Sequence, residues 1–205
     1  MILLVCAVPK ELAWLGPRAD VEVLVAGVGP VDAAARVARA LTKRRYDAVL
    51  CAGIAGAFRG VAAVGDGVIV GEETMELSLE TGERLVLPDG GVAADRVPAD
   101  AHLIEALAAF GFPLVRGITV SRVTSTDATA ARLRMRGAEI ESMEGFAVLR
   151  AAQLAGVPAI EVRGISNIVG DRSESAWDFE AGLLGLRRVL NATLDLLYTV
   201  PANAD

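Results

Sequence analysis

Short apolar runs with β-type composition alternate regularly with longer Ala- and Leu-rich runs, and this alternation most constrains the fold. The β-type runs span residues 2–8, 21–26, 48–52 and 114–123, and a further one ends in Arg163, Ser166 and Asn167. The helical runs span residues 31–45, 101–110, 127–136 and 180–197, and one more begins at Glu144. This order predicts an α/β fold with helices on both faces of a sheet.

The remaining segments fit one domain. The chain has 205 residues, of which 53% are hydrophobic, enough for one large core, and we find no repeat or linker. Residues 68–87 alternate in polarity, with Thr81-Gly82 as a predicted hairpin tip, and residues 90–99 read as a surface loop. We therefore expect a single domain over residues 1–205.

The overall charge limits the classes of partner. The formal net charge is -6 and the pI is about 4.9, which argues against a nucleic-acid or membrane-surface partner. The apolar residues 1–8 lack a basic leader and are far shorter than the roughly 20 residues of a membrane span. We expect a cytoplasmic protein with a small-molecule substrate.

Few side chains are suited to metal or nucleophile chemistry. Cys6 and Cys51 lie within apolar runs and are expected to be buried hydrophobic side chains rather than a disulfide or metal ligands. His102 is the only histidine and begins a surface-type helix, which disfavours both a Ser-His-Asp triad and a zinc site. No metal and no cofactor are expected.

Two glycine clusters, residues 27–29 and 53–56, each follow a β-type run. Neither has the spacing of a P-loop or a dinucleotide fingerprint, which also disfavours a nicotinamide-dependent oxidoreductase. One interpretation is a strand-to-helix turn that needs positive φ. The other is close approach of the backbone to a sugar or a base.

Three polar residues follow β-type runs or begin helices at the expected mouth of the sheet. They are Glu11, Glu144 and Asn167. Ligands of α/β sheets bind at the carboxyl ends of strands. Two carboxylates and an amide, without histidine or metal, suit cleavage of a glycosidic bond through an oxocarbenium-like transition state.

The motifs around these residues resemble those of the purine nucleoside phosphorylase and nucleosidase superfamily. The resemblance covers almost the whole chain, with successive motifs at residues 6–12, 53–57, 142–145 and 162–167. It is specific in Ser-Met-Glu-Gly (142–145) and Arg-Gly-Ile-Ser-Asn (163–167), and weak between residues 66 and 115. The nearest branches are the methylthioadenosine/adenosylhomocysteine nucleosidases and the futalosine hydrolases. The resemblance implies a three-layer α/β/α fold with a central mixed sheet, and a homo-oligomer (dimer or tetramer).

The resemblance also implies roles for individual residues. Glu11 matches the glutamate that positions the attacking water, Met143 the residue packed under the ribose, and Glu144 the carboxylate that binds the 2'- and 3'-hydroxyls. Arg163 matches an arginine that organises Glu144. The remaining matches are Ser166 and Asn167, which face the purine, and Ala55 and Gly56, where the backbone approaches the nucleoside.

Asn167 is a departure from the adenine-specific branch, which has an aspartic acid at this position. An asparagine cannot give a proton to N7, but its NH2 group can donate a hydrogen bond to N7 or to a 6-oxo oxygen. Hypoxanthine leaves as an anion with charge on N7 and O6, so a donor there stabilises the transition state. Asn167 therefore favours a 6-oxopurine, the base of futalosine.

Residues 121–126 are a second departure, because the aromatic residue that stacks on adenine in relatives is missing there. Hydrogen bonds from Thr124 or Ser125 are one replacement. Trp177 has two open interpretations, a cover over the ligand or a core residue. Arg122 is a candidate for the carboxylate of the benzoate on the 5' side of futalosine, with a surface role as its alternative.

The expected reaction is hydrolysis rather than phosphorolysis. Phosphorylases of the superfamily carry a glycine-rich loop with arginine after the first strand, whereas this chain has Val-Pro-Lys-Glu there (8–11). Futalosine hydrolysis would place the chain in menaquinone biosynthesis. The alternatives are a methylthioadenosine/adenosylhomocysteine or aminodeoxyfutalosine nucleosidase, and a non-catalytic nucleoside-binding protein. Residues 61–70 and 110–114 are candidates for an oligomer interface.

Overall fold

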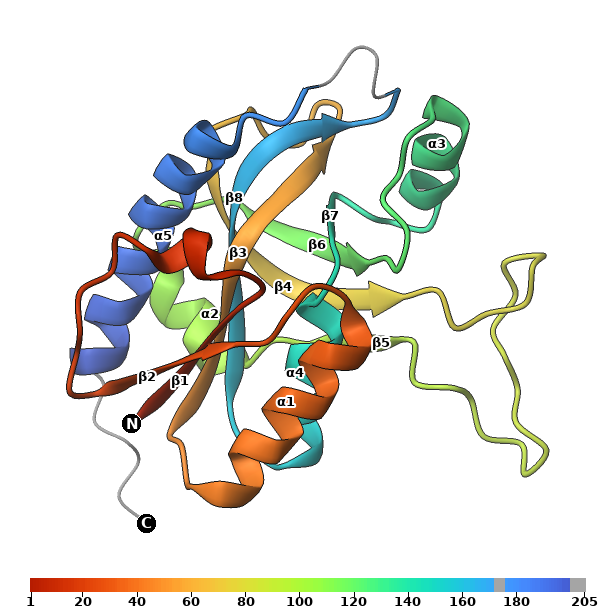
Figure 1. Cartoon of the computed structure of the whole chain (residues 1–205). Coiled ribbons are helices and arrows are strands. Elements are labelled where there is room, and N and C mark those ends of the chain that lie inside the picture. The colour runs from red at the N-terminus through yellow and green to blue at the C-terminus, as the bar shows by residue number, and fades with distance from the viewer. Residues whose placement is uncertain (172–175, 200–205) are drawn as a thin grey trace.

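The computed structural model describes residues 1–171 and 176–199, which form a mixed sheet with helices packed on it (Figure 1). The sheet order is β2-β1-β3-β7-β6-β4-β5, and β8 pairs with both β3 and β4. The strands are β1 (Ile2–Cys6), β2 (Val21–Val25), β3 (Ala48–Phe58), β4 (Gly67–Met75), β5 (Arg96–Pro98), β6 (Leu114–Thr119), β7 (Ile140–Ser142) and β8 (Ala159–Val169).

The predicted helices are present, with slightly different ends. They are α1 (Pro30–Lys43), α2 (Ala101–Ala108), α3 (Asp127–Met135), α4 (Gly145–Leu154) and α5 (Phe179–Thr199). A short 3-10 helix, η1 (Pro9–Leu12), follows β1. Helix α1 packs beside α4, and α5 packs along β8, β4 and β3. The mixed α/β architecture predicted from the sequence is thus confirmed.

The way β8 pairs was not expected. It closes part of the sheet into a ring. It runs parallel to β3 and antiparallel to β4, while β7 and β6 bridge β3 and β4 on the other side. Helix α5 covers β8 closely, since a Cβ on Gly164 would lie 1.9 Å from the carbonyl oxygen of Gly182. This contact requires glycine on the strand.

Of the two interpretations of residues 53–56, the strand-to-helix turn is wrong. Strand β3 continues through these residues to Phe58, and neither Gly53 nor Gly56 has positive φ. The first cluster does form a turn, because Gly27 and Gly29 have φ of 84° and 99° and precede α1. Helix α1 therefore begins where predicted, whereas the second cluster is part of the sheet.

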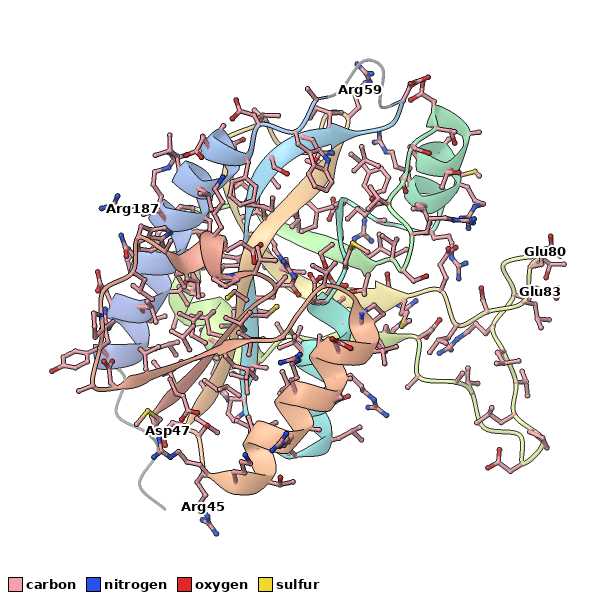
Figure 2. The ribbon with its side chains drawn as sticks, viewed as in Figure 1. Arg45, Asp47, Arg59, Glu80, Glu83 and Arg187 are labelled. Carbon is pink, nitrogen blue, oxygen red and sulfur yellow. The ribbon has the colours of Figure 1, made fainter. Side chains whose placement is uncertain are left out.

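An arm formed by residues 76–95 projects from the body between β4 and β5 (Figure 1). A bridge between Ser78 and Arg84 confirms the hairpin tip predicted at Thr81-Gly82. The predicted surface loop at 90–99 is only partly correct, because it ends in strand β5. Glu80 and Glu83 point outward at the tip of the arm (Figure 2).

Candidate active site

A cavity of about 190 Å³ lies where β1, β3, β7 and β8 end or bend. It brings together seven of the ten predicted site residues: Glu11, Ala55, Gly56, Met143, Glu144, Ser166 and Asn167. The eighth, Arg163, lies just behind the cavity, and Thr124 and Ser125 are not part of its lining. Sequence segments more than 100 residues apart thus meet around one space.

Glu11 is held in the cavity by three backbone donors. Its Oε2 accepts hydrogen bonds from the N–H groups of Ala7 (2.9 Å) and Val8 (3.1 Å), and its Oε1 accepts from Ile54 (3.0 Å). The short helix η1 places it there directly after β1, and only 3% of the residue is exposed. The carboxylate is therefore fixed in one orientation, with lone pairs left to accept a proton from a bound water.

Glu144, the residue before α4, is held from two sides. Its Oε1 accepts a hydrogen bond from the N–H of Gly29 at 2.9 Å, and its Oε2 lies 3.8 Å from Nη1 of Arg163. Gly29 has a φ of 99° in the turn that precedes α1. Burial raises the pKa of Glu144, while the charge of Arg163 and the hydrogen bond from Gly29 oppose that rise.

Arg163 is buried behind the cavity and ties several of its walls together. Its Nε donates to Oε1 of Glu161 at 2.7 Å, and its Nη1 donates to the carbonyl of Ile54 at 3.3 Å. A Cβ on Gly53 would lie 2.6 Å from both Arg163 Nη1 and Glu11 Oε1. The side chains of Arg163 and Glu11 thus approach each other in the space that a side chain at position 53 would fill. The position fits the expected role of Arg163 as an organiser.

Adjacent residues Ser166 and Asn167 both line the cavity because β8 bulges there. Along β3 the register moves from Ala55 opposite Ile165 to Gly56 opposite Asn167, which leaves Ser166 as the extra residue. In a regular strand, successive side chains point to opposite faces. A bulge re-aims a side chain, and here it turns two polar groups into one site.

The amide of Asn167 has a defined orientation. Its Oδ1 lies 2.9 Å from the hydroxyl of Ser166, whose single proton is shared between this oxygen and the carbonyl of Ala55 at 3.2 Å. With Oδ1 on Ser166, Nδ2 is the donor that remains. The only protein acceptor described for Nδ2 is the carbonyl of Ile168, at a long 3.4 Å. A Cβ on Gly56 would lie 2.9 Å from Nδ2, so a glycine is needed beside it. The site therefore offers a hydrogen-bond donor where the purine is expected.

The loop at 121–126 differs from expectation. The N–H of Thr124 donates to Oε1 of Glu141 at 3.0 Å, and its hydroxyl donates to Oε2 of the same residue. Val123 and Glu141, rather than Thr124 and Ser125, line the cavity. Arg122 lies in a separate hollow at the end of β6.

Two aromatic residues, Trp177 and Phe179, line the cavity near the start of α5. The N–H of Asp178 between them donates to the carbonyl of Ser166 at 2.8 Å and holds this segment against β8. Trp177 is 50% exposed, so it covers the cavity and is not a core residue. Phe179 and Glu141 were missed by the sequence analysis, because neither belongs to a motif.

The cysteines, possible metal-binding groups and helix lengths bear on the chemistry that the chain can support. Cys6 and Cys51 are buried and unpaired, as predicted, and burial raises the pKa of Cys6 to about 12. In residues 1–171 and 176–199 we find no group of three or more His, Cys, Asp or Glu placed to hold a metal ion. No helix in the same ranges is long and apolar enough to cross a membrane.

Comparison with known proteins places the chain in a family. The model of the Phosphorylase superfamily matches residues 3–199. The chain is 40% identical to a futalosine hydrolase of Acidothermus cellulolyticus over 199 residues, which cover 90% of this chain and 79% of that protein. It is 42% identical to a futalosine hydrolase of Streptomyces coelicolor over 175 residues, covering 80% and 74%.

Solved structures agree on the fold. A 5'-methylthioadenosine/S-adenosylhomocysteine nucleosidase of Helicobacter pylori superposes with a TM-score of 0.81 at 15% identity, over 95% of this chain and 97% of that one. The corresponding enzyme of Streptococcus pneumoniae, in complex with a transition-state inhibitor, gives 0.80 at 20% identity, over 96% and 99%. On the strength of the family match and the identity to its curated relatives, this chain belongs to the phosphorylase superfamily.

Proposed function

We propose that this chain hydrolyses the N-glycosidic bond of futalosine, giving hypoxanthine and dehypoxanthinyl futalosine, a step of menaquinone biosynthesis. The observation that carries the proposal is the Asn167 amide, whose donor Nδ2 lines the same cavity as the carboxylates of Glu11 and Glu144. The futalosine hydrolases among its relatives support the choice of substrate.

In the proposed mechanism the ribose lies over Met143, and Glu144 accepts hydrogen bonds from its 2'- and 3'-hydroxyls. As the C–N bond breaks, its electron pair leaves with hypoxanthine, and Asn167 Nδ2 donates to the charge that develops on N7 and O6. Water attacks the anomeric carbon while Glu11 takes its proton. The sugar ends with a new hydroxyl, and the hypoxanthine anion is protonated from solvent.

Water rather than phosphate is the proposed nucleophile, because the backbone N–H groups near the end of β1 already donate to a carboxylate. The N–H groups of Ala7, Val8 and Ile54 already bind Glu11, whose negative charge would repel a phosphate. We expect futalosine to be cleaved at the same rate in phosphate-free buffer as in phosphate, with no sugar phosphate formed. Released base is measured by chromatography. A strict requirement for phosphate would show that the enzyme is a phosphorylase.

The same assay separates the alternative substrates. Futalosine and inosine should release hypoxanthine, whereas methylthioadenosine and aminodeoxyfutalosine should release adenine much more slowly. Fast release of adenine would favour the alternative nucleosidases. No cleavage of any of the four would favour the non-catalytic nucleoside-binding protein.

Lys10 rather than Arg122 is the proposed partner of the benzoate carboxylate of futalosine. Its ammonium lies 4.4 Å from the ring centre of Phe179, a lining residue, and 3.7 Å from Glu180 Oε1. This ion pair is exposed, so Glu180 competes only weakly for Lys10. Arg122 lies in the other hollow.

We expect Lys10→Gln to lower kcat/KM for futalosine by about fivefold, the worth of an exposed ion pair of about 1 kcal/mol. Inosine, which lacks the benzoate, should be unaffected, and this controls for any disturbance of Glu11. Lys43→Gln is the matched control, since Lys43 is an exposed lysine at the end of α1 and does not line the cavity. Equal losses for both nucleosides, or a futalosine-specific loss in Arg122→Gln, would exclude this role for Lys10.

We further propose that the chain is a single domain that works in the cytoplasm as a dimer or tetramer. Of the two predicted interface segments, 61–70 contributes Val68, Ile69 and Val70 to the core, whereas Phe110 and Leu114 are exposed. The arm adds exposed apolar side chains, namely Leu77, Leu79, Leu85, Val86, Leu87 and Val92. These residues support an interface between copies of the chain.

A further inference from the structure

Two glutamates with no part in the mechanism above are fully buried behind the cavity. Glu73 on β4 and Glu161 on β8 are both 0% exposed. Glu73 Oε1 and Glu161 Oε2 are the buried side-chain oxygens for which the described residues provide no hydrogen-bond partner. Unsatisfied buried polar atoms are rare in native proteins and call for an explanation.

These two oxygens border the same point, which places them no more than about 5 Å apart. Both are within 2.6 Å of the point that a Cβ on Gly145 would occupy, at the start of α4. Each carboxyl group is anchored by its other oxygen, because Glu73 Oε2 accepts from the hydroxyl of Thr119 at 2.8 Å and Glu161 Oε1 accepts from Arg163 Nε at 2.7 Å. Two acceptors that face each other repel, whereas one proton between them satisfies both.

The charges around the pair also favour one bound proton. Arg163 is the cation that faces it, and Arg163 is shared with Glu144 at 3.8 Å. The other groups near the pair are the hydroxyls of Thr119 and Ser142 and, against Arg163, the thiol of Cys51. Glu11 also lies beside Arg163, since both approach the Cβ position of Gly53. One guanidinium cannot neutralise four buried carboxylates, and carboxylates that share a site do not all ionise.

We propose that Glu73 and Glu161 share one proton, and that the resulting singly charged pair positions Arg163 and, through it, Glu144. The part that concerns Glu144 rests on the proposed function, in which this carboxylate binds the ribose. The shared proton itself does not depend on any activity. Burial and the charge of Glu161 raise the pKa of Glu73 well above its usual value, which agrees with a proton held there.

The first test is the pH dependence of stability. Because the pKa of Glu73 is raised in the folded state, the stability it contributes is complete below its unfolded pKa and is lost as the pH rises toward the folded pKa. Glutamine does not titrate, and its NH2 group can donate to Glu161 in place of the proton. The urea midpoint of Glu73→Gln should therefore rise relative to wild type between pH 5 and pH 8.

Glu105→Gln is the control for loss of one carboxyl group, since Glu105 is exposed on α2. The difference in urea midpoint between this variant and wild type should stay constant from pH 5 to pH 8. A constant difference for Glu73→Gln as well would overturn the shared proton. So would failure of this variant to fold, because the amide can make the same hydrogen bond.

The second test concerns the positioning of Glu144. Glu73→Leu leaves Glu161 Oε2 without the shared proton, while Oε1 keeps its contact with Arg163. We expect KM for futalosine to rise about tenfold with a smaller change in kcat, whereas Glu73→Gln restores KM to within about threefold of wild type. Equal KM values in the two variants would overturn the link to Arg163. Absence of futalosine turnover by the wild type would instead refute the proposed function, and the urea measurement would still decide on the proton.

Discussion

Replacing Glu11 by glutamine is expected to lower kcat for futalosine by about 10²–10⁴-fold, the range for loss of a general base, while the nucleoside still binds. The amide keeps the size of the side chain but cannot take a proton from water. The three N–H groups that point at the carboxylate also cannot all find an acceptor on glutamine. We therefore expect a loss of stability of about 1–3 kcal/mol as well.

Steady-state kinetics give kcat and KM, and hypoxanthine binding can be followed by calorimetry. Glu139→Gln is the matched control, because this glutamate also accepts a backbone hydrogen bond, from Arg116, but does not line the cavity. Its kcat should equal that of the wild type. Unchanged turnover in Glu11→Gln would remove Glu11 from the chemistry.

The second large effect is expected from Asn167→Asp. It replaces the donor toward O6 by a carboxylate, so kcat/KM for futalosine and inosine should fall by about 10²-fold, as on removal of one donor from an oxyanion site. Adenine nucleosides should lose much less, because a protonated aspartic acid can donate to N7 and then accept from the 6-amino group. The measured quantity is the ratio of kcat/KM between inosine and adenosine.

Asn167→Ala separates loss of the donor from gain of a charge. It should lower kcat/KM for hypoxanthine nucleosides without raising kcat/KM for adenine nucleosides. Ser166 keeps its other acceptor, the carbonyl of Ala55 at 3.2 Å, in both variants. If Asn167→Asp preferred inosine over adenosine as strongly as the wild type does, the proposed role of Asn167 in base recognition would be refuted.

The places of Glu11 after β1 and of Glu144 before α4 were predictable from the sequence. Asn167 was expected at the same mouth of the sheet, but it lies within β8 and reaches the cavity through the bulge at Ser166. The path of β3 was not predictable. Gly53 and Gly56 look like turn residues locally, yet the space of their missing Cβ atoms is taken by the side chains of Arg163 and Asn167. That requirement comes from β8, more than 100 residues later.

The register of β8 could not be predicted from the sequence for a similar reason. The extra residue at Ser166 is defined only against β3, so no pattern within β8 marks it. The pairing of Thr124 with Glu141 likewise joins two segments that the sequence analysis treated separately. Sequence periodicity indicates which face of an element is apolar, whereas these contacts depend on how distant strands align.

The most direct test of the proposed site is a crystal structure of the Glu11→Gln variant with futalosine bound. We expect the hypoxanthine O6 or N7 within hydrogen-bonding distance of Asn167 Nδ2, the ribose hydroxyls on Glu144, and residue 11 facing the anomeric carbon. A purine ring away from position 167, or residue 11 turned from the anomeric carbon, would contradict the proposed mechanism.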